Sequence, residues 1–135
     1  MTSDPVDPLD TARRMWADDP ASRALGMELR DLGPGHAVVE MTVRADMVNG
    51  HGVAHGGLVA ALADSAFALA CNSRGVATVA AGFDVSFLEP AHEGDVLVAA
   101  AEERALRGRS GIYDVTVRLG ETVIAELRGR SRALR

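Results

Sequence analysis

Residues 49–73 read N-G-H-G-V-A-H-G-G-L-V-A-A-L-A-D-S-A-F-A-L-A-C-N-S and decide the fold. They predict the end of a glycine-containing loop and then a long helix from about residue 54 to residue 73, which Gly75 ends. Because apolar residues lie on every side of this helix, the rest of the chain must enclose it. A helix of roughly 18 to 20 residues is about 27 to 30 Å long, enough to run the length of a strongly curved sheet.

One carboxylate, Asp64, lies in the middle of this apolar helix. Burying an unpaired carboxylate costs several kcal/mol by order of magnitude, so a function explains its presence better than packing does. Ser65 is its polar neighbour, while the nearby Cys71 is a lone cysteine and cannot form an internal disulfide. The apolar setting of Cys71 indicates a reduced, packed thiol.

The helix opens on His55, Gly56 and Gly57. The first backbone N–H groups of a helix lack partners within it, and the helix dipole adds partial positive charge there. This end of the helix can therefore bind an anion or an oxyanion, which places a second catalytic ingredient on the segment that carries Asp64.

The rest of the chain alternates strands and turns. A short N-terminal helix from about residue 10 is expected to stop at Pro20, and one more helical turn to end at Gly26. Strand patterns then cover residues 27–32, 36–43, 76–88, 95–106, 111–119 and 122–132. Because their connections are short, we expect antiparallel neighbours. The whole chain, residues 1–135, is predicted to be one α+β domain with a curved antiparallel sheet around the long helix.

Composition excludes several classes of function. The formal net charge is −5 and aromatic residues make up 4% of the chain, whereas nucleic-acid grooves need a basic face with stacking platforms. The acidic N-terminal decapeptide does not resemble a signal peptide, and no apolar stretch is long enough to span a bilayer. We therefore expect a cytoplasmic protein that binds neither nucleic acid nor membranes.

The basic residues are all arginines, and they concentrate near the end of the chain. Residues 101–135 carry eight arginines against five acidic residues. Arginine makes fixed, bidentate contacts with phosphate groups. The turn formed by Arg107, Gly108, Arg109 and Ser110 is therefore a candidate phosphate-binding site, although most of these arginines can equally be solvated surface residues.

An ordered series of motifs resembles the hotdog-fold thioesterases, specifically the PaaI group of phenylacetate-degradation acyl-CoA thioesterases. Besides H-G-G-x-x-x-x-L-A-D-S-A-F-A-x-A-C-N-S, the series contains A-L-G-M, A-V-V-E-M-T-V, M-V-N-G-H, S-F-L-E-P-A-H-E-G-D, G-I-Y-D-V and L-R-G-R-S. The resemblance covers nearly the whole chain. It implies a hotdog fold and hydrolysis of an acyl-CoA thioester, with no metal and no cofactor, in a homodimer that commonly doubles to a tetramer.

The resemblance also assigns roles to residues. Asp64 matches the catalytic carboxylate, acting as nucleophile or as base for water, and the backbone N–H of Gly56 matches the oxyanion donor. His55 and Asn49 match the residues that position the loop and the thioester carbonyl. In the family, Asp64 comes from one subunit and the segment at residues 49–56 from its neighbour. We also expect Gly57, Ser65 and Phe83 to bind substrate.

Alternative functions remain to be weighed. A non-catalytic acyl-CoA-binding protein would keep the groove but would need no carboxylate, and a hotdog dehydratase pairs a histidine with an acid elsewhere on the fold. His51 and His55 lie in a glycine-containing loop without the following glutamate of a zinc-protease motif, which argues against a metal pair. The sequence contains no nucleophile elbow for a serine hydrolase. The acyl group is not determined, and an arylacetyl group is favoured by analogy.

Overall fold

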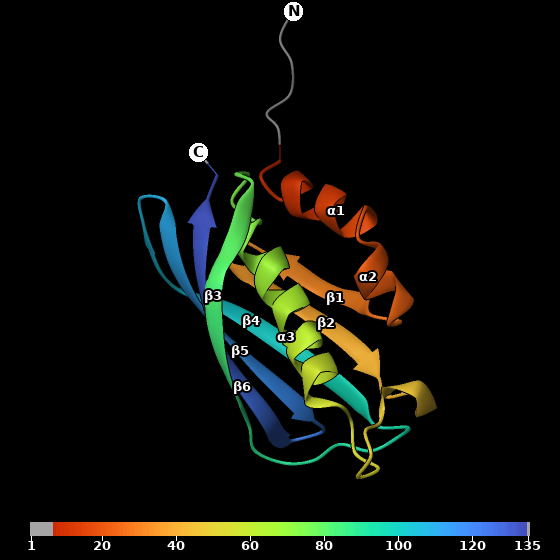
Figure 1. The fold of residues 1–135 in the computed structure, drawn as a ribbon. Coiled ribbons are helices and arrows are strands. Elements are labelled where there is room, and N and C mark those ends of the chain that lie inside the picture. Colours follow the sequence, from red (N-terminus) through yellow and green to blue (C-terminus); the bar gives the residue numbers. More distant parts are fainter. Residues whose placement is uncertain (1–6, 135) are drawn as a thin grey trace, which may run out of the picture.

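The computed structural model describes residues 7–134 (Figure 1). Residues 1–6, which belong to the acidic N-terminal decapeptide, and residue 135 lie outside the described part. The helices are α1 (Asp10–Ala17), α2 (Pro20–Ala24) and α3 (Gly56–Cys71), with a 3₁₀ turn at Ala45–Met47. The strands are β1 (Glu28–Gly33), β2 (His36–Thr42), β3 (Thr78–Phe87), β4 (Val96–Arg107), β5 (Ser110–Leu119) and β6 (Thr122–Ala133).

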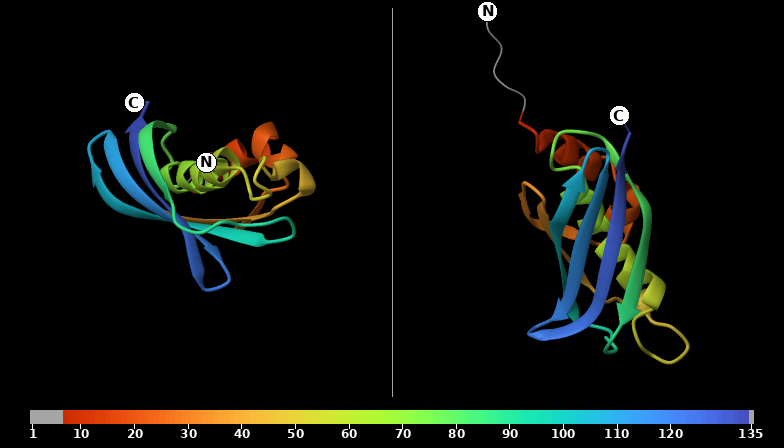
Figure 2. Two further views of the ribbon diagram at one scale, coloured as in Figure 1. Left: turned by 60° about the horizontal axis from the view of Figure 1, so that its bottom comes forward. Right: turned by 90° about the vertical axis from the view of Figure 1, so that its left-hand side faces the viewer.

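The six strands form one sheet in the order β1-β2-β4-β5-β6-β3, and all neighbouring pairs are antiparallel. The sheet curves around α3, while α1 and α2 lie along one side of the helix (Figure 2). The predicted α+β hotdog architecture is therefore confirmed.

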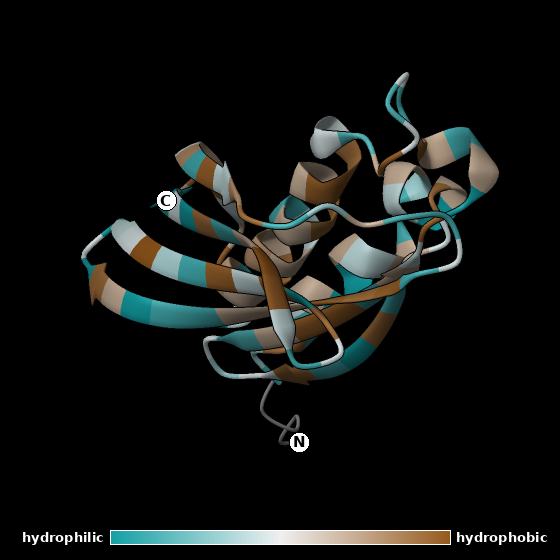
Figure 3. Cartoon of the chain, turned by 90° about the horizontal axis from the view of Figure 1, so that it is seen from below, coloured by the Kyte–Doolittle hydropathy of each residue, from teal (hydrophilic) through white to brown (hydrophobic). Residues whose placement is uncertain are grey.

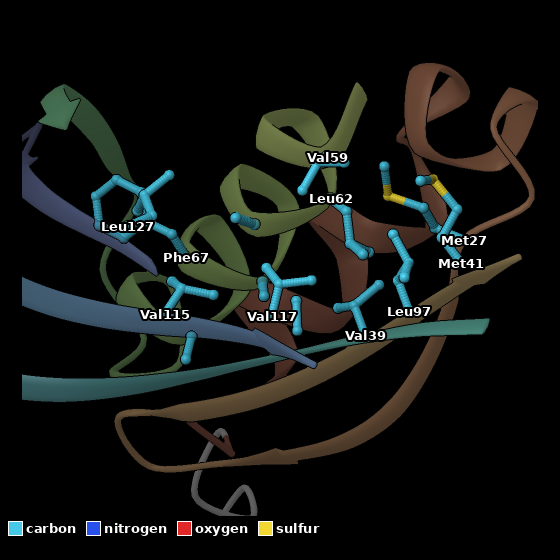
Figure 4. Close-up of a cluster of buried hydrophobic side chains, with 14 of the residues drawn as sticks. Met27, Val39, Met41, Val59, Leu62, Phe67, Leu97, Val115, Val117 and Leu127 are labelled. Atoms are coloured by element: carbon cyan, nitrogen blue, oxygen red, sulfur yellow. The ribbon is translucent and has the colours of Figure 1, made fainter. Parts of the chain in front are cut away.

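The core lies between α3 and the concave face of the sheet, where Leu62 and Phe67 meet Val39, Val115 and Leu127 (Figure 4). Hydrophobic and hydrophilic residues alternate along the strands, so the opposite face of the sheet is more polar (Figure 3). The helix lies very close to β6: a Cβ atom at Gly129 would come within 2.7 Å of the Phe67 ring. Glycine at this position therefore sets the spacing of helix and sheet.

The central helix is shorter than predicted, at 16 residues rather than 18 to 20. Ala54 does not join it, because its N–H donates to the carbonyl of Ala91 at 2.7 Å and it bridges to Val48. At the other end, Asn72 caps the helix, and its side chain accepts a hydrogen bond from the Thr78 N–H at 3.0 Å. Hydrogen bonds of the flanking residues to other segments therefore set both ends of α3. Helical periodicity does not reveal such bonds.

The first helix ends before Pro20, as predicted: α1 ends at Ala17, and Pro20 is the first residue of α2, a position that suits its fixed φ. The prediction that short connections join antiparallel neighbours is wrong at one place. The short connection at residues 88–95 does not join neighbouring strands, because β3 lies beside β6 at the far edge of the sheet. Ala91 is buried in this connection, which crosses the end of the sheet and does not form a hairpin.

Candidate active site

The start of α3 presents a free hydrogen-bond donor. The His55 Nδ1 atom accepts from the Gly57 N–H at 3.2 Å, so that donor is already used. Among the hydrogen bonds within residues 7–134, none has the Gly56 N–H as donor. The preceding loop is held by Asn49, whose Oδ1 accepts from the His51 N–H at 2.9 Å. Asn49 and His55 thus fix the loop and the helix start beside the Gly56 N–H.

Gly56 borders an apolar cavity of about 270 Å³ at the ends of β3 and β6. The ring of Phe87 lies so near that a Cβ atom at Gly56 would be 3.2 Å from it. The cavity is lined by Val53, Ala54, Gly56, Val59, Phe87, Glu89, Pro90, Ala91 and Ile124. Glycine leaves the N–H of the first helical residue open to a group in this cavity.

Asp64 borders a different cavity, of about 210 Å³, between α3 and the N-terminal helices. The side chain is half-buried rather than fully enclosed. Burial, together with the negative charge of Asp19, raises the pKa of the Asp64 carboxyl. The cavity is lined by Met15, Asp19, Ala21, Ser22, Leu25, Met27, Ala61, Asp64, Ser65 and Ala68. Asp64 is thus a poorly solvated carboxylate in a mainly apolar site, where it is a stronger base than an exposed aspartate.

One chain does not bring the two groups together. Gly56 and Asp64 are separated by eight residues of α3, about 12 Å along the axis, and they border separate cavities. A reacting carbonyl must be within about 3 Å of both an oxyanion donor and the group that attacks or activates water. Within one chain, therefore, Gly56 and Asp64 cannot act on the same carbonyl.

Two further residues, Asp19 and Ser22, belong to this site, although no sequence motif points to them. The Ser65 Oγ is 2.8 Å from the Ser22 Oγ, and Ser22 is bonded to the carboxylate of Asp19. The sequence D-P-A-S signals a helix start, because aspartate caps and proline suits the first turn. Nothing in that local signal reveals that this helix packs on Ser65, since the contact joins residues far apart in the chain.

The candidate phosphate-binding turn joins β4 to β5 and is exposed. Its arginines differ: Arg109 donates through Nε and Nη2 to the Ala133 carbonyl, at 3.1 and 3.0 Å, whereas Arg107 reaches only the adjacent Leu106 carbonyl. The Ser110 Oγ accepts from Arg132 at 3.1 Å. Arg107 is thus the arginine of this turn that uses only Nη1 within residues 7–134 and keeps its Nε and Nη2 donors for a ligand.

Phe83 lies on β3, opposite Gly129 of β6, and is 37% exposed in the single chain. It belongs to a row of exposed apolar side chains on and beside this edge strand: Val76, Val79, Phe83, Phe87 and Leu88. An edge strand with this composition favours contact with another protein surface.

An antiparallel sheet encloses α3, which has a free N–H at its start and a carboxylate in its middle. The sequence motifs predicted this arrangement. Residues 51–126 match the family model described as the thioesterase superfamily. This chain belongs to the thioesterase superfamily.

Relatives within the family are similar to this chain in sequence and in structure over most of its length. Acyl-coenzyme A thioesterase PaaI of Escherichia coli is 42% identical over 124 residues, which cover 91% of this chain and 89% of that protein. The structure of the E. coli PaaI protein from the phenylacetic acid degradation operon matches with a TM-score of 0.92 at 39% identity, covering 96% and 94% of the two chains. A mutant of phenylacetic acid degradation protein PaaI from Thermus thermophilus matches with a TM-score of 0.84 at 42% identity, covering 86% and 100%.

Two other kinds of site are absent from the described residues. None of their helices is long and apolar enough to cross a membrane. Residues 7–134 also contain no group of three or more histidine, cysteine, aspartate or glutamate side chains placed to hold a metal ion.

Proposed function

We propose that this thioesterase-family protein hydrolyses acyl-CoA to the free acid and CoA, with Asp64 and the Gly56 N–H as its catalytic groups. The observation that carries the proposal is their environment. Asp64 is half-buried in a mainly apolar cavity, and Gly56 carries an unpaired donor at the start of the same helix. The identity with E. coli acyl-coenzyme A thioesterase PaaI supports acyl-CoA as the substrate class.

The chemistry needs few groups because a thioester is already activated for acyl transfer. The oxygen nucleophile, supplied by Asp64 or by a water that Asp64 deprotonates, attacks the carbonyl carbon. The Gly56 N–H stabilises the oxyanion that forms, and the C–S bond then breaks to release the CoA thiolate. In the water route, the proton taken by Asp64 passes to the thiolate, and the acyl group leaves as the acid. In the Asp64 route, the acyl group stays on Asp64 as an anhydride, which a water molecule then cleaves to the acid while its other proton goes to the thiolate. We propose that no metal and no cofactor take part, so activity persists in a chelator.

The separation of the two groups supports a site shared between subunits of a dimer. Asp64 then comes from one chain and Gly56 from its partner, with β3 and its apolar side chains as the contact between subunits. A tetramer formed from two such dimers is part of the same proposal. We further propose an arylacetyl group such as phenylacetyl or hydroxyphenylacetyl, supported by the relatives from phenylacetic acid degradation.

The decisive variant is Gly56→Pro, which deletes the backbone N–H and adds a ring beside Phe87. Proline is well tolerated at the first position of a helix, and His55 before it has φ −61° and ψ 127°, a conformation that precedes proline comfortably. Gly56→Ala is the matched control, because it adds a Cβ atom near Phe87 but keeps the N–H. We expect Gly56→Pro to lose on the order of 10²-fold in kcat or more, and Gly56→Ala to lose far less.

Subunit complementation tests the shared site. Asp64→Asn and Gly56→Pro are each expected to be inactive with phenylacetyl-CoA in an assay that traps the released thiol. If the halves come from different chains, mixed dimers regain one intact site. Mixtures that exchange subunits fully yet stay inactive would show that the site is not shared. Substrate binding without turnover by the unaltered protein would instead favour the non-catalytic acyl-CoA-binding alternative.

A further inference from the structure

A chain of three hydrogen-bonded side chains leads from α2 to the residue beside Asp64. α2 packs against α3 (Figure 1). The Asp19 Oδ1 accepts from the Ser22 N–H at 2.9 Å, and its Oδ2 accepts from the Ser22 hydroxyl at 2.7 Å. The Ser22 Oγ lies 2.8 Å from the Ser65 Oγ, and Ser22 is only 4% exposed. All three residues border the cavity of Asp64.

The direction of these hydrogen bonds follows from counting protons. A carboxylate oxygen only accepts, so the single hydroxyl proton of Ser22 goes to Asp19. Ser22 therefore has no proton left for Ser65, and the Ser65 hydroxyl must donate to Ser22. Its remaining lone pairs can accept hydrogen bonds from a group in the cavity. Asp19 thus sets Ser65 as an acceptor, although the two side chains do not touch.

We propose that Ser65 accepts a hydrogen bond from the water that attacks the thioester, and that Ser22 and Asp19 are positioning residues that keep Ser65 in this role. The proposal rests on the proposed function and selects one of its two routes, in which Asp64 is the general base. The water donates one hydrogen to Ser65 and gives the other to Asp64 as its oxygen bonds to the carbonyl carbon. The C–S bond then breaks, and the proton held by Asp64 passes to the departing thiolate.

The hydrogen-bonded side chains Asp19, Ser22 and Ser65 have a second measurable effect, because the charge of Asp19 acts on the pKa of Asp64. Among the described residues that border the cavity, Asp19 is the only other ionisable side chain. On the same helix, Cys71 is a buried neutral thiol, whose pKa is raised to about 12 by burial. Arg23 of α2 borders an adjoining cavity with Asp19, and its guanidinium bonds to the Ala17 carbonyl. Removing the charge of Asp19 should therefore lower the pKa of Asp64.

The test uses Asp19→Asn, which preserves the helix cap but reverses the chain. Asparagine caps helices as well as aspartate does, and its oxygen must face the Ser22 N–H. Its NH₂ group then donates to the Ser22 hydroxyl, which turns its proton toward Ser65. Ser65 becomes a donor toward the cavity. Asp18→Asn is the matched control, because Asp18 is exposed and lies next to Asp19.

With phenylacetyl-CoA, we expect Asp19→Asn and Ser65→Ala each to lower kcat about tenfold with KM nearly unchanged. The double variant should be no slower than Ser65→Ala, because both changes break one chain. The acidic limb of the kcat–pH profile should move to lower pH in Asp19→Asn but stay in place in Asp18→Asn.

Wild-type kcat and pH profile in Asp19→Asn, or losses that multiply in the double variant, would overturn the inference. Asp19→Asn decides the matter even if Ser65→Ala does not fold. Asp64→Asn, assayed in parallel, separates the two proposals. If Asp64→Asn is inactive and Asp19→Asn is fully active, the proposed function stands and only the water-positioning chain is wrong. An active Asp64→Asn would contradict the catalytic assignment itself.

Discussion

At the scale of single residues, Asp64 combines its proposed catalytic role with a cost in stability. Its pKa is raised, first by burial and then by the charge of Asp19, so the folded protein holds the Asp64 proton more tightly than the unfolded chain does. The protonated form therefore stabilises the fold, and this contribution is lost as pH rises through the folded-state pKa. At neutral pH the charged form opposes folding.

Replacing Asp64 by asparagine should remove this cost. We expect Asp64→Asn to have a larger free energy of unfolding than the unaltered protein at about pH 7, and the gain to shrink as pH falls toward the ordinary aspartate pKa of 3.8. Chemical denaturation at a series of pH values measures both. A gain that is constant with pH would mean that the substitution acts through packing rather than through the charge.

The sequence identified Asp64 because a charge in an apolar helix stands out against its neighbours. It also identified Gly56, because a helix start has unpaired donors wherever it lies in a fold. Asp19 and Ser22 were not identified, because their relation to Ser65 depends on how α2 packs against α3. Local patterns therefore found the groups proposed to react and missed those that orient them.

At the scale of elements, we expect substitutions of the two arginines in the turn between β4 and β5 to have different effects. Arg107→Ala should raise KM for acyl-CoA about tenfold, because the Nε and Nη2 donors of this guanidinium are available for a CoA phosphate. It should leave KM for a pantetheine thioester, which lacks the nucleotide, nearly unchanged. Arg109→Ala, whose guanidinium holds the Ala133 carbonyl, should mainly lower the unfolding temperature. Equal rises in KM for both thioesters with Arg107→Ala would refute a role in phosphate binding.

The alternating pattern predicted where the strands lie, but the short connection after β3 wrongly predicted β4 as its neighbour in the sheet. The connection between β3 and β4, residues 88–95, is short, yet it crosses the sheet. It does so because main-chain bonds tie it to distant elements: the Ala91 carbonyl accepts from Ala54, and the Asp95 carbonyl accepts from Val43. Loop length alone carries no information about such long-range pairing.

At the scale of the whole molecule, the apolar edge formed by β3 leads us to expect activity that depends on dimer formation. Val79→Glu places a charge on this edge, where Val79 is 46% exposed, and pairing of two identical edges brings two copies of the charge into one contact. We expect the dimer to dissociate at least about tenfold more easily and activity to fall with dilution. Light scattering and turnover measured over a concentration series test this. Val96→Glu, on β4 and 41% exposed, is the control.

The other edge of the sheet is built differently. β1 carries Glu28, Arg30 and Asp31 and contains a bulge between Leu29 and Asp31. Charged side chains and bulges discourage further strand addition. If β3 pairs with its own copy, the joined sheet has a β1 strand at each end and no apolar edge left to extend it. Growth of the sheet by strand addition then stops at two chains. The same asymmetry of the two edges that favours pairing through β3 thus discourages fibre formation.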